Sequence, residues 1–295
     1  MTNKLQNPVH LPLTELVWVG VFAVLLYSAV CIFLFFQQSR FIFFPSPIIE
    51  TTPEFFNLGY KEVRLPVQVS SDWVEHIHGW WIEANPSNPK VLLYLHGNGV
   101  NIGANVAHAN RLQKLGFSVL LIDYRGYGRS EGGFPNEQQV YQDAATAWDY
   151  LVYQRNISPN QIFIYGHSLG GAIAIDLAVK HPDAAGLIVE SSFTSIQEVA
   201  ACRNSFRLFP VNLILTQRFD SIGKIPHLKI PVLFIHGTAD EVVPAFMSEN
   251  LYAATSAPKE LLLISEAMHN NVAEVDYSLY KEAVLSLVQQ VQANQ

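Results

Sequence analysis

Ser168 is the first candidate for chemistry in this chain. It lies in Gly166-His-Ser-Leu-Gly170, after an apolar run that ends at Tyr165 and before a second run that begins at Gly171. A serine with glycines two residues before and after it, at a sharp turn from a strand to a helix, forms a nucleophile elbow. The turn exposes the serine oxygen beside the positive end of the new helix. The pattern therefore predicts a serine that attacks a carbonyl carbon.

A serine hydroxyl is a weak nucleophile at neutral pH, so the elbow requires a histidine base further along the chain. His269 follows the apolar run Leu261–Ile264 through a short polar loop. This places it at the carboxyl edge of the predicted sheet, where the serine also lies, and we expect His269 to be the base. Three other histidines follow the serine. We expect His181 to point away from it, His227 to lie at the opposite edge of the sheet, and His236 to be a hydrogen-bonded structural residue.

The imidazole of the base in turn needs a carboxylate to orient it. Asp240 lies in the loop after the predicted strand Val232–His236, within reach of the far nitrogen of His269. We therefore expect Asp240 to be the acid. Glu190, at the end of an earlier strand, is the alternative, and we expect Glu241 to face solvent or to cap the next helix.

Acyl transfer also needs N–H donors for the oxyanion that develops in the transition state. One donor is expected to be the backbone N–H of Leu169, directly after the nucleophile. The second is expected to be the backbone N–H of Asn98, in the loop His96-Gly-Asn-Gly99 that follows the strand Val91–Leu95. His96 itself is expected to be structural.

Two other patterns are weighed against cofactor or metal binding. Gly97-x-Gly99-x-x-x-Gly103 resembles a dinucleotide fingerprint, but it is one residue too long and does not fall on the first strand of the domain. His76 and His78 share one face of a strand, but no third ligand lies near them in the sequence. We therefore expect neither a cofactor nor a metal ion.

Strands and helices alternate along most of the chain. From Val91 onward the predicted strands are short and continuously apolar, as in a parallel sheet that is buried on both faces. The alternation predicts an α/β fold, a three-layer sandwich with a mostly parallel sheet. The rhythm breaks over residues 192–230, which are rich in phenylalanine and leucine, and we expect a short helical cap there.

The N-terminal part of the chain predicts a membrane anchor. Leu16 to Phe36 contains no charged residue and is about 31 Å long as a helix, enough to span a bilayer. Arg40 and the aromatic cluster Phe41–Phe44 suit the headgroup region. A buried core helix and a cleaved signal peptide are the alternatives. The expected organisation is an anchor over 1–40 (span 16–36), a linker over 41–59 and a hydrolase domain over 60–295 with its cap at 192–230.

The charge of the chain excludes one class of function. The formal net charge of the 295 residues is −7, and lysines and arginines are scattered, so nucleic acid is not an expected partner. Cys31 and Cys202 lie far apart, which supports neither a disulfide framework nor a zinc cluster.

Five motifs occur in one order: the His96 loop, the turn Asp123-Tyr-Arg-Gly-Tyr-Gly-Arg-Ser130, the elbow, the Asp240 loop and His269-Asn270. From about Tyr60 to its end the chain thereby resembles the α/β-hydrolases. With its N-terminal span it resembles the membrane-anchored abhydrolase-domain serine hydrolases, a branch similar to protein depalmitoylases. The resemblance implies hydrolysis of carboxylic esters or thioesters without a cofactor. The chain lacks the cysteine-rich N-terminal segment of soluble depalmitoylases, so an acyl-protein substrate is not implied.

We therefore expect a membrane-anchored serine hydrolase that cleaves ester or thioester bonds of apolar acyl substrates through an acyl-enzyme. Its expected partners are the bilayer and an acyl substrate, which a lipid could supply. Two alternatives stay open: a serine peptidase of the same fold, and a membrane-tethered binding protein without catalysis.

Overall fold

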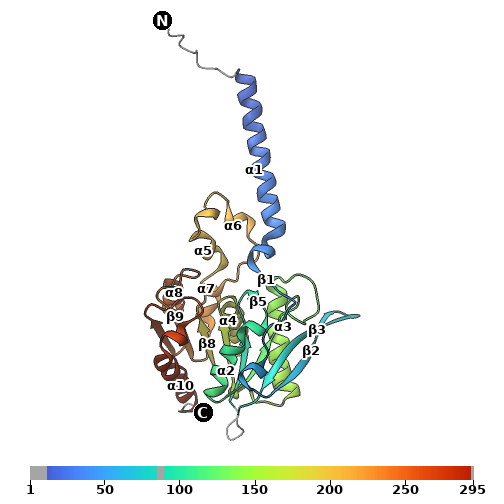
Figure 1. Ribbon diagram of the computed structural model, residues 1–295. Coiled ribbons are helices and arrows are strands. Elements are labelled where there is room, and N and C mark those ends of the chain that lie inside the picture. Colours follow the sequence, from blue (N-terminus) through green and yellow to red (C-terminus); the bar gives the residue numbers. More distant parts are fainter. Residues whose placement is uncertain (1–11, 85–89, 294–295) are drawn as a thin grey trace, which may run out of the picture.

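The computed structural model describes residues 12–84 and 90–293, so residues 1–11 of the expected anchor and residues 85–89 and 294–295 of the expected hydrolase domain lie outside it. The predicted fold class is confirmed, because an eight-stranded, mostly parallel sheet lies between two layers of helices (Figure 1). The strands are β2 (Tyr60–Ser70), β3 (Trp73–Ile82), β4 (Lys90–Leu95), β6 (Phe117–Ile122), β7 (Ile162–His167), β8 (Gly186–Glu190), β9 (Val232–Gly237) and β10 (Lys259–Ile264).

The strand order is β10-β9-β8-β7-β4-β6-β3-β2, with β4 between β7 and β6. All neighbours from β6 to β10 pair in parallel, whereas β3 pairs antiparallel with β2 and with β6. The carboxyl ends of the parallel strands therefore meet at one edge. That edge receives the loops that carry the elbow, Asn98, Asp240 and His269.

The apolar runs form buried strands because both of their faces are covered. Along β4, Leu93 and Leu95 join the core on one face, whereas Leu92 and Tyr94 join the core on the other. This alternation is the two-residue period of a strand. The main covering helices are α3 (Glu137–Asp149), α4 (Leu169–Lys180) and α8 (Phe246–Ala254) on the first face, and α2 (Val106–Lys114) and α10 (Tyr277–Ala293) on the second.

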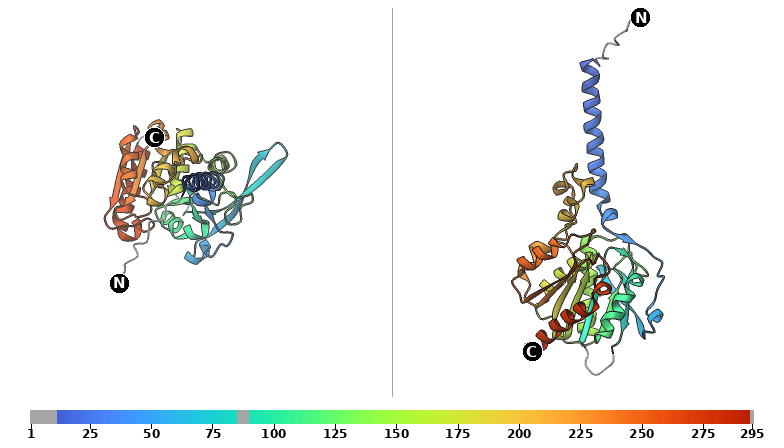
Figure 2. Two further views of the ribbon diagram at one scale, coloured as in Figure 1. Left: turned by 90° about the horizontal axis from the view of Figure 1, so that it is seen from above. Right: turned by 60° about the vertical axis from the view of Figure 1, so that its left-hand side comes forward.

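The insertion after β8 is a cap made of short helices. It holds α5 (Ile196–Ala201), α6 (Val211–Ile214) and α7 (Ser221–Lys224), together with 3-10 turns at Asn204–Phe206 and Ile225–His227. Ser195 is the N-cap of α5, and its side chain accepts a hydrogen bond from the N–H of Glu198. The cap lies over the carboxyl edge of the sheet, beside the N-terminal helix (Figures 1 and 2).

The N-terminal helix α1 (Leu13–Ile42) projects away from the domain (Figure 2). Its 30 residues extend beyond the predicted span at both ends and correspond to about 45 Å, more than the ~30 Å of a bilayer core. It is long and apolar enough to cross a membrane, and its most apolar window is not buried inside the protein. The exposed apolar surface does not fit the alternative of a buried core helix.

Residues 41–59, expected as a linker, make specific contacts with the domain. Strand β1 (Phe44–Pro45) pairs in parallel with β5 (Gly99–Val100), and the Asn98 side chain donates a hydrogen bond to the carbonyl of Ile42. The sequence did not predict this pairing, because two-residue strands carry no periodicity. It ties the end of α1 to the loop that contains Asn98.

Candidate active site

The turn from β7 into α4 has the strained geometry of a nucleophile elbow. Ser168 has a φ of 53°, in a region that non-glycine residues rarely adopt. A Cβ atom at position 170 would overlap the carbonyl oxygen of Leu95, and one at 166 would overlap the carbonyl of Gly170. Three hydrogen bonds hold the serine backbone: its N–H donates to the Glu190 carbonyl at 2.9 Å, and its carbonyl accepts from Ser192 Oγ at 2.8 Å and from the N–H of Gly171 at 2.9 Å. The glycines are therefore required by close packing.

The three side chains expected to share a site lie in one hydrogen-bonded line. His269 Nε2 is 3.0 Å from Ser168 Oγ, and His269 Nδ1 is 2.7 Å from Asp240 Oδ2. With Asp240 ionised, Nδ1 carries the proton and Nε2 accepts the serine hydroxyl. The three residues come from the loops after β7, β9 and β10, and all three are buried. The structure therefore brings together residues separated by about a hundred positions in the sequence.

Asp240 is held as a carboxylate. Its Oδ1 accepts hydrogen bonds from the backbone N–H groups of Val242 and Val243, at 2.8 and 2.9 Å. Burial alone would raise the pKa of Asp240, but hydrogen bonds from His236 and His269 outweigh burial and hold the pKa well below its ordinary value. The carboxylate is therefore charged at neutral pH and stabilises the imidazolium that forms when His269 takes a proton.

His236 is a second imidazole on the same carboxylate, with its Nε2 3.1 Å from Asp240 Oδ2. The same nitrogen is 2.9 Å from the Val243 carbonyl, and Nδ1 lies 2.6 Å from Ser248 Oγ. The sequence predicted a hydrogen-bonded structural histidine at this position, and these contacts agree with that expectation. The sequence did not predict the contact of His236 with Asp240.

His167, inside the elbow, is a contact that the sequence did not predict. Its Nε2 lies 3.1 Å from the carbonyl oxygen of His269, and the two rings are 5.2 Å apart. Burial, followed by the charge of His269, lowers the pKa of His167 to about 3, so the ring is neutral. A neutral ring that donates from Nε2 to this carbonyl positions the His269 backbone. No local pattern could show this contact, because it joins two distant loops.

The alternatives named from the sequence lie elsewhere. The Glu190 carboxylate is buried and accepts a hydrogen bond from the Tyr165 hydroxyl at 2.6 Å. Glu241 is exposed, and His181 stacks on Trp148 at 4.4 Å. His227 lies in a 3-10 turn before β9, away from the carboxyl edge. None of these four side chains therefore belongs to the hydrogen-bonded line of Ser168, His269 and Asp240.

Asn98 and Leu169 line the same pocket as Ser168. Leu169 is the first residue of α4, where backbone N–H groups have no partner within the helix. The Asn98 carbonyl accepts from the N–H of Phe44 and the hydroxyl of Tyr127, and its side chain donates to Ile42. None of these three hydrogen bonds uses the backbone N–H of Asn98. Both amides are thus available to an oxyanion bound at the serine.

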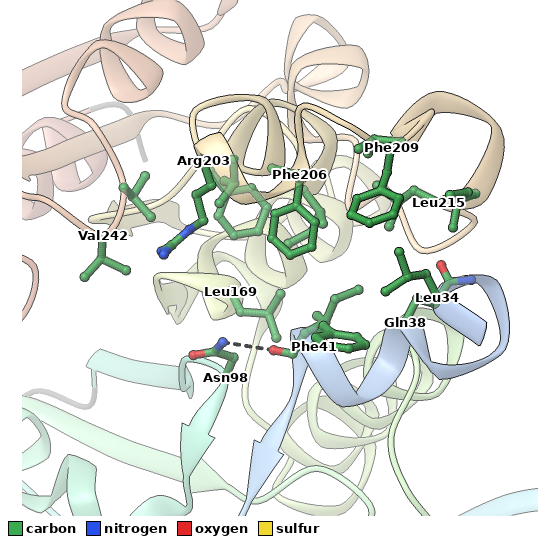
Figure 3. A pocket seen from close by; sticks show the side chains of 18 of the residues that line it. Leu34, Gln38, Phe41, Asn98, Leu169, Arg203, Phe206, Phe209, Leu215 and Val242 are labelled. Atoms are coloured by element: carbon green, nitrogen blue, oxygen red, sulfur yellow. Dashed lines mark hydrogen bonds between the residues drawn. The ribbon is translucent and has the colours of Figure 1, made fainter. Parts of the chain in front are cut away.

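The pocket is a cavity of about 470 Å³ between α1, the cap and the elbow (Figure 3). The helix α1 contributes Leu34, Gln38 and Phe41, and the cap contributes several apolar side chains. Arg203 is the one charged side chain among the described residues that line it. The cap residues in the lining are Phe193, Ile196, Val199, Ala200, Arg203, Phe206, Phe209, Val211, Ile214 and Leu215.

The loop that resembles a dinucleotide fingerprint forms hydrogen bonds with other parts of the protein. The Asp123 carboxylate accepts a hydrogen bond from the N–H of Ile102 at 2.8 Å, and Asn101 donates to the carbonyl of Ile48. Among residues 12–84 and 90–293, no group of three or more metal-ligating side chains is found. His76 instead lies 3.0 Å from Glu131.

A mostly parallel sheet with an elbow serine, a following acid loop and a last-strand histidine defines the class of α/β-hydrolases. The family model described as serine aminopeptidase, S33, matches residues 86–221. An uncharacterized protein of Mycobacterium tuberculosis is 35% identical over 259 residues, covering 87% of this chain and 89% of that protein. Alpha/beta hydrolase domain-containing protein 17B of Homo sapiens is 33% identical over 217 residues, covering 72% and 71%.

The chain therefore belongs to the α/β-hydrolase family. Alpha/beta hydrolase domain-containing protein WAV2 of Arabidopsis thaliana is 35% identical over 225 residues, which cover 70% of each chain. Among solved structures, an esterase of Pyrococcus furiosus superposes with a TM-score of 0.69 at 19% identity, covering 84% of this chain and 98% of that one. This likeness agrees with the fold described above.

Proposed function

We propose that the protein is a membrane-anchored serine hydrolase that cleaves ester or thioester bonds of apolar acyl substrates. The observation that carries the proposal is the hydrogen-bonded line from Asp240 through His269 to Ser168, which ends in a largely apolar pocket. Membership of the α/β-hydrolase family supports hydrolysis in general. The bond type and the substrate class are inferred from the pocket.

The first half of the reaction forms an acyl-enzyme. Ser168 Oγ attacks the acyl carbonyl carbon while His269 Nε2 takes its proton, and the negative oxygen is held by the N–H groups of Asn98 and Leu169. The bond to the leaving group then breaks, and His269 gives its proton to the departing oxygen or sulfur. Asp240 stays ionised and stabilises the imidazolium.

The second half releases the acid. Water gives a proton to His269 Nε2 and attacks the acyl carbon of the serine ester, and the same two amides hold the oxyanion. Collapse of this intermediate breaks the bond to Ser168 Oγ, which regains its proton from His269. The products are a carboxylic acid and the free enzyme, and no redox step or cofactor is needed.

The lining of the pocket supports an apolar acyl group. The side chains contributed by α1 and the cap, apart from Gln38 and Arg203, are apolar, and burial of a hydrocarbon chain stabilises by about 0.8 kcal/mol per CH₂ group. Its volume of about 470 Å³ falls within the usual range for small-molecule sites. The apolar surface of α1 supports the second half of the proposal, an anchor in the bilayer.

The test uses the full chain in detergent. A fluorophosphonate probe should label the wild type and leave Ser168→Ala unlabelled, and p-nitrophenyl esters of increasing acyl length should be hydrolysed by the wild type. A matched control is Ser191→Ala, a buried serine outside the line. Equal labelling of the wild type and Ser168→Ala would refute a serine nucleophile. An unlabelled wild type without turnover would favour the binding protein that has lost catalysis.

A serine aminopeptidase is the second candidate, because the matching family model carries that description. An aminopeptidase must hold the positively charged amino terminus of its substrate, for which a carboxylate is the usual partner. No aspartate or glutamate is among the described residues that line the pocket, and its one charged side chain is the cation Arg203. The structure therefore favours esters. Turnover of aminoacyl p-nitroanilides above that of the matching esters would reverse this choice.

A further inference from the structure

The cap packs against the half of α1 that is nearer to the domain. The Tyr27 hydroxyl donates a hydrogen bond to the Leu208 carbonyl at 2.9 Å, and its ring stacks on Phe209 at 6.1 Å. Lower on the helix, Gln38 Oε1 accepts from the N–H groups of Thr216 and Gln217. The cap therefore contacts α1 at Gln38 and at Tyr27. Figures 1 and 2 show the cap beside the part of α1 that is nearer to the domain.

The level of these contacts has a consequence for the membrane. Tyr27 lies near the middle of the uncharged run Leu16–Phe36, and Gln37 is the first polar residue after that run. The rise from Gln37 to Tyr27 is about 15 Å, which is half of the ~30 Å hydrocarbon core of a bilayer. If α1 spans the membrane, the tip of the cap lies within one leaflet.

The surface of the cap fits this location. Leu208 and Leu213 are the most exposed large apolar side chains of the cap, at 80% and 81%, and neither lines the pocket. Between Glu198 and Asp220 the cap carries Arg203, Arg207 and Arg218 and no acidic residue, although the whole chain has a net charge of −7. Apolar tips with nearby arginines are typical of segments that lie in the interface of an anionic membrane.

We infer that the cap is inserted in the leaflet next to the domain, with Leu208 and Leu213 among the acyl chains and the exposed Arg218, which follows the Gln217 contact with Gln38, at the level of anionic lipid headgroups. The inference rests on the membrane anchor in the proposed function and deepens it. Because α1 and the cap form walls of the pocket (Figure 3), insertion of the cap places these walls in the same leaflet. The substrate is accordingly an acyl ester or thioester that resides in the bilayer and enters the pocket laterally, from this leaflet.

The test measures depth in vesicles of phosphatidylcholine and phosphatidylglycerol that contain the full chain. In a background of Cys31→Ser and Cys202→Ser, single cysteines replace Leu208 or Leu213 and carry a nitrobenzoxadiazole label. Phosphatidylcholine with a doxyl group at carbon 5 or 12 quenches labels within the hydrocarbon core. The inference predicts quenching at both positions at least twofold stronger than at the control Glu282→Cys, on the exposed face of α10.

A second reference separates the inference from its premise. Leu25→Cys lies on α1, exposed and above the contacts with the cap. Quenching at Leu25 without quenching at Leu208 and Leu213 would overturn insertion of the cap while leaving the anchor intact. Absence of quenching at all three positions would overturn the anchor and the inserted cap together. Neither result depends on catalytic activity, so a failed esterase assay would not be confused with a failed insertion.

The role of Arg218 is tested with the same labels. Quenching at Leu213→Cys should increase as the fraction of phosphatidylglycerol increases, because an arginine at the membrane surface is attracted to anionic lipids. Arg218→Gln should flatten this dependence. A matched control is Arg129→Gln, an exposed arginine of the domain that pairs with Glu62. An unchanged dependence in Arg218→Gln would overturn the headgroup contact.

Discussion

His236 Nε2 lies 3.1 Å from Asp240 Oδ2, so the carboxylate that orients His269 is also hydrogen-bonded to a second imidazole. The Asp240 carboxylate therefore has four donors in all, two imidazoles and the N–H groups of Val242 and Val243. A carboxylate fixed from several sides holds its partner imidazole at one angle. We therefore expect His236 to be a positioning residue that acts through Asp240.

Replacement of His236 tests this arrangement. A hydrogen bond to a charged group contributes about 1.5–3 kcal/mol, so His236→Phe should lower kcat roughly 10- to 150-fold with little change in KM. His236→Gln can keep a donor near the position of Nε2 and should recover part of the loss. Ser248→Ala removes only the partner of the other nitrogen and serves as the control. A wild-type kcat for His236→Phe would contradict a positioning role.

Asp240→Asn should lower kcat more than His236→Phe does, because it changes which nitrogen of the His269 imidazole carries the proton. An amide in place of the carboxylate favours the imidazole tautomer that cannot accept the serine proton, and in other triads this change lowers kcat by about 10⁴-fold. The measurement is turnover of a short p-nitrophenyl ester, with thermal unfolding in detergent as the check on folding. Glu241→Gln, which alters the exposed neighbour, should keep near wild-type turnover. A loss for Asp240→Asn below tenfold would remove Asp240 from the proposed mechanism.

Glu190→Gln tests whether Glu190, rather than Asp240, is the carboxylate that orients His269. Burial raises the pKa of Glu190, and Arg111 and the Tyr165 hydrogen bond only partly offset this effect. The folded state thus binds a proton that the unfolded state releases above its ordinary pKa of about 4.3, so the free energy of unfolding falls as the pH rises from that value toward the raised pKa.

The glutamine variant should lack this part of the pH dependence and should retain the elbow, since Ser168 N–H bonds to the backbone carbonyl of residue 190. The measurement is the thermal midpoint in detergent over a series of pH values, together with ester turnover. Glu266→Gln, at an exposed position, is the control. A loss of turnover comparable to that of Asp240→Asn would instead identify Glu190 as the acid.

Gly170→Ala tests the close approach of α4 to β4. A Cβ atom at this position would overlap the carbonyl oxygen of Leu95, and neither backbone can give way without disturbing the elbow. Overpacking of this kind costs about 1–3 kcal/mol, and we expect a lower thermal midpoint together with reduced probe labelling of Ser168. Gly59→Ala is the matched control, because a Cβ atom there meets no atom within 4 Å. Equal stability of the two variants would contradict the packing described for the elbow.

The sheet and the elbow could be predicted from the sequence because their signals are local. Short apolar runs such as Val91–Leu95 and Val232–His236 show buried strands, and the glycines around Ser168 mark the turn. The carboxyl ends of parallel strands meet at one edge, so the chain order of serine, acid and histidine was enough to predict that the three residues meet.

The contacts that support the site could not be predicted in this way. His167 with the His269 carbonyl, His236 with Asp240, and Asn98 with Ile42 each depend on how loops pack after the sheet has formed. The two-residue pairing of β1 with β5 has no sequence signature either. The packing of the cap against α1 could not be predicted either. An apolar run of this length predicts a membrane anchor whether or not another part of the protein covers it.

The shared wall of α1 and the cap leads to the last prediction, on acyl-chain length. Leu34 on α1 lies at the end of the pocket away from Asn98 and Leu169, near Leu215 (Figure 3). A tryptophan at position 34 fills this end, so Leu34→Trp should lower the ratio of kcat/KM for a sixteen-carbon ester to that for a four-carbon ester. Loss of contact for even two or three CH₂ groups corresponds to about 1.6–2.4 kcal/mol, or roughly 15- to 60-fold in this ratio.

Leu25→Trp is the matched control, because Leu25 is an exposed residue of the same helix outside the pocket lining. The measurement is the same pair of esters in mixed micelles of fixed composition, so that both variants meet substrate at the same surface concentration. A ratio that falls equally in both variants would assign the effect to the surface of the helix. A ratio unchanged in Leu34→Trp would mean that the acyl chain does not reach α1, and the pocket between α1 and the cap would then not be the acyl site.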